Sequence, residues 1–163
     1  MTKLDDAPAT DEALRVSFDD IGLDNYAPYL MNRIMGRYNA NLRSEMAALG
    51  LSTAKMRALA ILSVRDGLHI GDLGVYAVVE QSTLSRALDA LTADGLVRRQ
   101  ADPSDQRASR VYLTDQGRAA FDRLWPHMID GHDAMFAGIP KSEQHAFIST
   151  LQKMLNNIRK HDI

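Results

Sequence analysis

Six side chains between Ser82 and Arg110 have the types and spacing needed to bind a nucleic-acid duplex. They are Ser82, Thr83, Ser85, Arg86, Arg107 and Arg110. Hydroxyl groups bond phosphate oxygens or base edges, and a guanidinium can bond guanine through two parallel hydrogen bonds. The first four are close enough in sequence to gather at one end of a helix, where they would suit a DNA major groove. The last two arginines suit a contact with phosphates or a narrow minor groove.

The helix that must present the first four side chains is predicted over residues 82–94. Its apolar residues are spaced i, i+3, i+4, i+7 and form one narrow stripe, Leu84, Ala87, Leu88 and Leu91. Gly95 ends the helix, and its N-terminus favours phosphate. The same polar residues are ordinary on a solvated helix face, so the helix alone leaves both interpretations open. Asp89 weakens the positive field, and one interpretation is that it orients Arg86 three residues earlier.

A hairpin is predicted directly after this helix. Residues 96–100 and 110–113 have strand character, and the polar segment 101–109 between them contains no large apolar residue. Arg107 and Arg110 lie at and beside its tip, and Arg98 and Arg99 lie on the outgoing strand. In a plain solvated loop, Asp102 and Asp105 would simply pair with these arginines. One such pair could also fix the hairpin so that another arginine points outward. The order of helix, stop and hairpin predicts a winged helix-turn-helix.

The remaining elements are predicted to be helical. Apolar spacing predicts a helix over 26–49 that ends at Gly50, a second from the N-cap Ser52 to residue 67, and a third over 70–76, followed by a turn at 77–81. Thr114 is predicted to cap a helix reaching about residue 137, kinked at Pro126. The last helix follows Pro140 and carries a nearly heptad apolar seam. The predicted fold class is therefore mainly α, with a small β-hairpin wing.

The predicted domain organisation has three parts. Residues 1–24 form an acidic, mobile or loosely docked arm with seven acidic side chains against Lys3 and Arg15. Residues 51–118 form the winged helix-turn-helix, and residues 25–50 and 119–163 form a helical dimerisation region. The terminal helices carry apolar faces too long for a small winged-helix core to cover, so two copies crossing these helices would bury them. A monomeric bundle that folds back on itself is the alternative.

Composition and charge limit the function classes. The chain has 163 residues, 45% hydrophobic and 25% charged, which is ordinary for a globular protein. No apolar run reaches the roughly 18 residues of a membrane span, the polar N-terminus resembles no secretory signal, and there is no cysteine. We therefore expect a cytoplasmic protein without a membrane partner. The net charge is −2, and residues 52–118 carry nine basic against eight acidic side chains, so bulk charge does not favour DNA binding.

Catalytic and metal-binding patterns are not found in the sequence. The five histidines are scattered without ligand spacing, and His127 and His132 are five residues apart, which fits one helical face poorly. Neither a G-x-S-x-G elbow nor a glycine-rich phosphate loop occurs. We therefore expect no enzyme activity, no metal and no cofactor.

The hairpin region resembles the multiple-antibiotic-resistance regulator (MarR) family of winged-helix transcription factors. The resemblance rests on GLVRRQADPSDQRASRVYLTDQG, residues 95–117, with a helix-ending glycine, a strand arginine, D-x-R and L-T-x-x-G. These positions are Gly95, Arg99, Asp105, Arg107, Leu113, Thr114 and Gly117. TLSRALDAL, residues 83–91, matches the recognition helix of the family, and the last helix is also typical; the resemblance covers about residues 26–160. Pro126 departs from the family pattern, and the absence of cysteine excludes its hydroperoxide-sensing mode.

The resemblance implies a homodimer whose helix 82–94 reads the major groove and whose wing touches backbone or minor groove through Arg107. It suggests a repressor that leaves an inverted-repeat operator when a small aromatic or phenolic effector binds. We expect an effector crevice where the dimerisation region joins the winged helix, lined by Met31, Tyr38, Met56 and Trp125, although core packing is the favoured role for any one of these residues taken singly. The alternative function is a winged-helix protein-interaction module without sequence-specific DNA binding.

Overall fold

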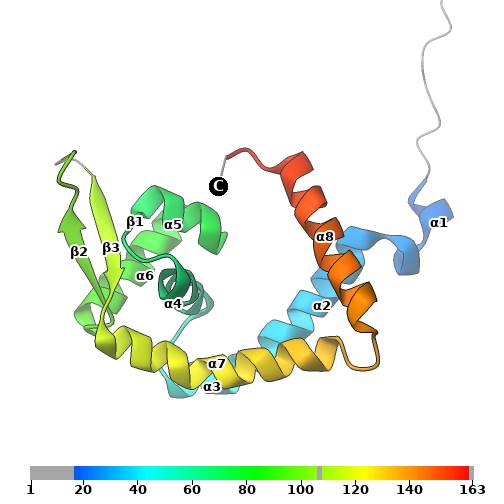
Figure 1. Cartoon of the computed structure of the whole chain (residues 1–163), viewed down its shortest axis with the longest axis horizontal. Helices are drawn as coiled ribbons and strands as arrows, with labels where there is room; N and C mark the ends of the chain where they lie inside the picture. The colour runs from blue at the N-terminus through cyan, green and yellow to red at the C-terminus, as the bar shows by residue number, and fades with distance from the viewer. Residues whose placement is uncertain (1–16, 106–107, 162–163) are drawn as a thin grey trace, which may run out of the picture. The chain divides into compact units, whose positions relative to one another are not determined.

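The computed structural model describes residues 17–105 and 108–161 (Figure 1). The described residues fall into two compact units that are separated between Arg37 and Tyr38. The first unit contains α1 (Phe18–Ile21), the short 3₁₀ helix η1 (Leu23–Asn25) and most of α2 (Ala27–Asn41). Ser17 caps α1 because its hydroxyl accepts from the Asp20 amide, while the Asp20 carboxylate accepts from the Ser17 amide. Residues 1–16 of the acidic arm predicted over 1–24 lie outside the described residues. The rest of the arm contains α1 and the start of η1.

The second unit contains the predicted winged helix and the helices that follow it. Its helices are α3 (Arg43–Ala48), α4 (Thr53–Val64), α5 (Ile70–Ala77), α6 (Gln81–Ala93), α7 (Asp115–Met135) and α8 (Lys141–Ile158). The single helix expected over 26–49 is interrupted at Leu42, which separates α2 from α3 in the sequence. The Leu42 side chain is buried. The predicted N-cap Ser52 is confirmed, because its hydroxyl accepts from the Lys55 amide at 3.3 Å. α7 runs through Pro126 from residue 115 to 135 without a break.

The sheet has three antiparallel strands in the order β1-β3-β2, formed by β1 (Leu68–His69), β2 (Val97–Ala101) and β3 (Ser109–Leu113). The hairpin β2–β3 pairs Val97 with Leu113 and Ala101 with Ser109. β1 pairs on the other edge of β3, with His69 opposite Arg110. The sequence did not predict β1, because two residues are too few for an alternating pattern. The hairpin therefore has a third strand beside the first half of β3, which ties it to the helices.

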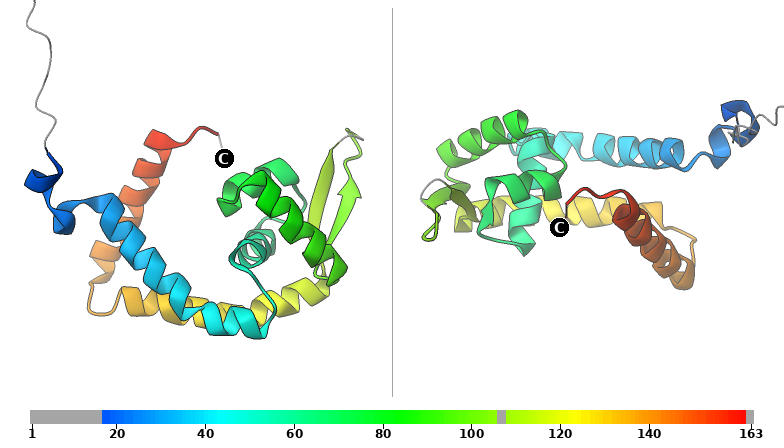
Figure 2. Two further views of the ribbon diagram at one scale, coloured as in Figure 1. Left: turned by 180° about the vertical axis from the view of Figure 1, so that it is seen from behind. Right: turned by 90° about the horizontal axis from the view of Figure 1, so that it is seen from above.

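The core of the second unit lies around α4, which contacts α5, α6 and α7 (Figures 1 and 2). Its fully buried side chains include Leu59, Leu62, Leu73, Leu84, Leu88, Leu91, Val97, Val111 and Leu124. Leu42 and Met46 belong to the same cluster. Residues 42–46, predicted to lie in the dimerisation region, thus also help to hold the winged helix. The expected fold class, a mainly helical winged helix-turn-helix, is confirmed.

Candidate nucleic-acid interface

Helix α6 buries one face and exposes the other, as its sequence pattern predicts. Leu84, Leu88 and Leu91 are fully buried and Ala87 nearly so. Ser82, Thr83, Ser85 and Arg86 are all exposed in its first two turns. Within the described residues, no hydrogen bond or ion pair engages the Arg86 guanidinium. The four side chains predicted to read a groove therefore lie together on a free helical surface.

The interpretation that Asp89 orients Arg86 is wrong in this structure. The Asp89 carboxylate lies 2.8 Å from the Arg99 guanidinium of β2 instead. Both partners are substantially exposed, so this ion pair contributes little to stability. It does connect the exposed side of α6 to the outgoing strand of the hairpin. Arg98, the neighbouring arginine, stacks over the Tyr112 ring at 4.4 Å and donates to Gln100.

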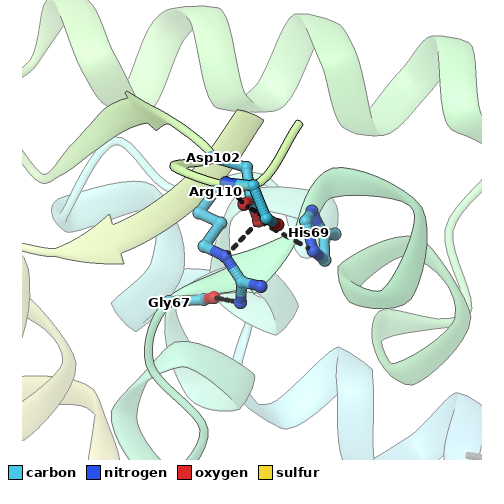
Figure 3. Close-up of polar contacts among 5 residues, drawn as sticks. Gly67, His69, Asp102 and Arg110 are labelled. Carbon is cyan, nitrogen blue, oxygen red and sulfur yellow. Dashed lines mark hydrogen bonds and ion pairs between the residues drawn. The ribbon is translucent and has the colours of Figure 1, made fainter. Parts of the chain in front are cut away.

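The loop end of the hairpin is fixed by Asp102, the residue after β2, which is 3% exposed. Figure 3 shows its polar contacts. One carboxylate oxygen accepts from the amide and hydroxyl of Ser104 at 2.7 and 2.6 Å. The other accepts from Arg110 Nε at 2.6 Å and lies 3.2 Å from His69 Nε2. Arg110 also donates to the Gly67 carbonyl at 3.0 Å. The carboxylate therefore joins the turn after β2 to β3 and β1, and Arg110 extends these contacts to the loop before β1.

These hydrogen bonds favour the charged carboxylate. The two hydrogen bonds from Ser104 are the main cause that lowers the pKa of Asp102 far below its ordinary value, and the Arg110 guanidinium adds to them against the opposing effect of burial. Among Asp102 and Asp105, the structure thus identifies Asp102 as the partner of Arg110. The prediction that one aspartate–arginine pair fixes the hairpin is confirmed for these two residues.

Of the two arginines predicted as wing contacts, Arg107 and Arg110, the structure describes only Arg110. Arg110 is half-buried, and its guanidinium points toward Asp102 and Gly67 (Figure 3). Its guanidinium is engaged within the protein, so we assign it to support of the wing, and a DNA contact by Arg110 has no support in this geometry. Arg107 lies outside the described residues, and its contact with DNA stays a sequence-based prediction.

The joint between the hairpin and α7 explains the motif L-T-x-x-G. Thr114 caps α7, because its hydroxyl accepts from the Gly117 amide at 3.0 Å. The same hydroxyl donates to the Gly95 carbonyl at 2.7 Å. The Thr114 amide donates to the Leu96 carbonyl at 3.1 Å. A Cβ on Gly117 would lie 2.0 Å from that same Leu96 oxygen. The end of α6, the start of β2 and the start of α7 therefore meet at a point that only glycine fits.

Acid should loosen the loop end of the hairpin in a way that depends on Asp102. Because its folded-state pKa is depressed, Asp102 stabilises the fold fully above the unfolded value of about 4, and this contribution is lost as the pH falls further toward the folded value. We expect Asp102→Asn to be less stable than the unaltered chain at pH 7 and the difference to shrink below about pH 4. Urea midpoints measured between pH 7 and pH 3 check this. Asp122→Asn, on an exposed position of α7, is the control, and a stability difference for Asp102→Asn that does not change with pH would contradict the assignment.

The four residues expected to line an effector crevice have different surroundings. Met56 is buried in the core of the second unit. Tyr38 packs against that core and lies within hydrogen-bond distance of the Met128 carbonyl, and burial raises its pKa. Trp125 is 48% exposed beside Phe121. Met31 belongs to the other unit. The crevice therefore stays a prediction.

Within residues 17–105 and 108–161, no three histidine, aspartate or glutamate side chains gather closely enough to hold a metal ion. None of the described helices has the length and apolar character needed to span a membrane.

Comparisons with known proteins agree with this geometry. Residues 49–108 match the model of the MarR family. The transcriptional regulator HosA of Escherichia coli O111:H- is 30% identical over 138 residues, covering 83% of this chain and 99% of HosA. A crystal structure of a MarR-family transcriptional regulator from Silicibacter pomeroyi is 72% identical, with a TM-score of 0.87, and covers 91% of this chain and 100% of that one. Both of these relatives are transcriptional regulators.

A third similarity concerns the fold alone. Bordetella bronchiseptica BpsR, whose structure addresses how 6-hydroxynicotinic acid regulates its DNA binding, is 24% identical, with a TM-score of 0.70 over 82% of this chain and 95% of BpsR. At this identity the likeness extends to the backbone and does not carry over individual binding residues.

Proposed function

This chain belongs to the MarR family of transcription regulators, and we propose from that membership that it is a homodimeric repressor which binds an inverted-repeat operator and leaves it when a small molecule binds. The observation that carries the proposal is the free surface of α6. Ser82, Thr83, Ser85 and Arg86 are exposed opposite the buried leucine stripe, next to a hairpin whose loop end is held by Asp102. A rigid helix with free donors at its N-terminal end is suited to a major groove.

Each residue has a separate part in this proposal. Arg86 reads a base, since a guanidinium can bond the O6 and N7 of guanine together. The hydroxyls of Ser82, Thr83 and Ser85 bond phosphates or base edges. Arg107 is the wing contact, and Arg110 supports the wing from within.

Exposed apolar side chains support a dimer. On α8, Phe147, Ile148, Leu155 and Ile158 are between 41% and 76% exposed. On α2, Leu30, Ile34 and Met35 are between 40% and 45% exposed. Large apolar surfaces of this kind mark association sites on folded proteins. A second copy related by a twofold axis would cover the same surfaces on both chains. Two linked copies of α6 would then meet two half-sites about 34–36 Å apart.

Arg86 is expected to discriminate between bases. Removal of its guanidinium in Arg86→Ala should weaken operator binding by about 1–3 kcal/mol and relax the preference at one position of each half-site. The measurement is fluorescence anisotropy with a duplex that the unaltered protein selects from a random pool, together with single-base variants of that duplex.

Arg123→Ala is the matched control, because Arg123 is an exposed arginine of α7 away from α6. It should leave both affinity and base preference unchanged. If Arg86→Ala binds all single-base variants in the same order as the unaltered protein, Arg86 does not read a base. If the unaltered protein selects no duplex at all, the winged helix serves as a protein-interaction module.

The effector part of the proposal rests on the family and on the fold shared with BpsR. A small aromatic or phenolic acid that binds where the dimerisation helices join the winged helix would act by favouring a spacing of the two α6 helices that misfits the operator. It can release DNA only through different affinities for the two spacings, with a coupling of about 1–3 kcal/mol.

Reciprocity gives the test of that coupling. Operator DNA should lower the affinity of an effector by the same factor by which the effector lowers the affinity for DNA. Calorimetric titration of 6-hydroxynicotinic acid and related aromatic acids, with and without operator duplex, measures the first factor, which reciprocity makes equal to the second. Equal affinities in the two titrations for every bound compound would exclude release by this route.

A further inference from the structure

The turn between α5 and α6 contains a strained residue. Val78 has φ 51° and ψ 53°, in the left-handed region. Among the described residues, every other position with positive φ is glycine, namely Gly22, Gly50, Gly67, Gly95 and Gly138. A β-branched side chain is strongly disfavoured there, because its Cβ crowds the backbone. The turn that leads into the proposed recognition helix is thus built on an unfavourable residue.

The hydrogen bonds of this turn are those of a helix end that normally uses glycine. The Val79 amide donates to the Gly74 carbonyl and the Val78 amide to the Val75 carbonyl, both at 3.2 Å. This pairing is the Schellman motif, whose left-handed position Val78 occupies. The Val78 side chain is 79% exposed, so its own packing does not offset the strain. Another interaction must hold the turn closed.

Arg57 supplies that interaction from α4. Its NH1 group donates to the Ala77 carbonyl at 3.3 Å and to the Val78 carbonyl at 3.1 Å. The last carbonyls of a helix lack partners within the helix, and a cation there is further favoured by the helix dipole. Met56 and Ala58, on either side of Arg57, are buried, so the backbone that carries this arginine is anchored in the core.

We infer that Arg57 is a positioning residue, which holds the strained turn at Val78 closed and thereby sets the direction in which α6 presents Ser82 to Arg86. α6 begins at Gln81, three residues after Val78, so a rotation of the Val78 backbone would redirect the whole helix. The consequence for DNA rests on the proposed function. The lock, by which we mean the two hydrogen bonds from Arg57 to the Ala77 and Val78 carbonyls, is a property of the free protein.

The DNA test uses the full-length chain and a duplex selected from random sequences by the unaltered protein. Arg57→Met keeps the apolar stem and removes the donors. We expect it to weaken binding roughly tenfold, the size of one lost hydrogen bond of a charged group. The slope of log affinity against log salt should not change, because no phosphate contact is lost. Val78→Gly in the Arg57→Met background should restore most of the affinity, because glycine adopts the left-handed conformation without strain.

A direct phosphate contact by Arg57 predicts the opposite pattern. The salt slope would then become shallower by about 0.9 and Val78→Gly would rescue nothing, which would overturn the inference. Arg65→Met is the matched control, because Arg65 lies at the end of the same helix and contacts only the Tyr76 side chain in the described structure, at 3.0 Å. It should bind as the unaltered protein does.

Hydrogen exchange of the Val79 amide tests the lock without DNA. We expect Arg57→Met to speed this exchange roughly tenfold and the added Val78→Gly to slow it again. Should Arg57→Met fail to fold, Arg57→Lys serves instead, because its single ammonium reaches the carbonyls less well and should give a smaller acceleration. Unchanged exchange in both variants would overturn the lock. Failure of the unaltered protein to select any duplex would instead refute only the proposed function.

Discussion

Leu155→Asp is expected to break the dimer and, with it, operator binding. Leu155 is 60% exposed on the apolar side of α8, where a second copy is proposed to cover it. The substitution removes the burial of a leucine, about 1.5–3 kcal/mol, once in each chain, and places an unpaired carboxylate in the interface. The total of about 3 kcal/mol or more corresponds to a dimer dissociation constant raised roughly 150-fold. Analytical ultracentrifugation over a concentration series measures it.

The matched control is Asn156→Asp, which adds the same charge at the next residue, on the polar side of α8. It should leave the dimer intact. DNA affinity is expected to fall with dimerisation for Leu155→Asp only, because a single α6 contacts one half-site. If the unaltered chain sediments as a monomer and still binds the selected duplex, the dimer proposal is wrong.

Gly117→Ala is expected to be the most destabilising small substitution in the second unit. The new Cβ would lie 2.0 Å from the Leu96 carbonyl oxygen and 2.8 Å from Leu113 Cδ1. The first of these atoms belongs to the backbone, so no rotamer change relieves the contact, and β2 or α7 must shift. We expect a loss of about 3 kcal/mol or more and a fall in the thermal midpoint of roughly 6–12 °C.

Gly71→Ala provides the comparison for this prediction. Gly71 lies in α5, and a Cβ there would meet nothing within 4 Å. Because alanine is the better helix former, this variant should be as stable as the unaltered chain or slightly more stable. Calorimetry of both variants checks the pair, and a midpoint for Gly117→Ala within 2 °C of the unaltered chain, at about 2–4 °C per kcal/mol, would contradict the proposed fit at this joint.

The helical face of the proposed site could be predicted because periodicity reports burial directly. The stripe from Leu84 to Leu91 is long enough to separate the two faces of α6, and every polar residue predicted to be exposed is exposed. The caps at Ser52 and Thr114 were predictable for a similar reason, since a hydroxyl before an apolar run satisfies free amides. Local chemistry was sufficient for these features.

Features that depend on distant partners could not be predicted. Asp102 and Asp105 are equivalent in sequence, and only the pairing of β1 with β3 places His69 and Arg110 around Asp102. β1 itself is too short for a pattern. The partner of Asp89 proved to be Arg99 rather than Arg86, because the hairpin folds back beside α6. Val78 gave no signal, since the usual sign of a left-handed turn is glycine.

Core and ligand-binding residues are also hard to separate in sequence. Met56 was proposed for an effector crevice on its apolar character, and it is buried in the core. An apolar side chain that packs and one that lines a cavity obey the same spacing, so periodicity cannot distinguish them.

Selection of bound sequences from a random duplex pool tests the central claim most directly, with the full-length protein at a stated salt concentration. The account predicts enrichment of an inverted repeat whose half-sites are centred about one helical turn apart, roughly 34–36 Å. It also predicts that Arg86→Ala enriches a repeat relaxed at one position in each half. Enrichment of a single, non-repeated site, or of no sequence beyond the starting pool, would contradict a dimer that reads DNA through α6.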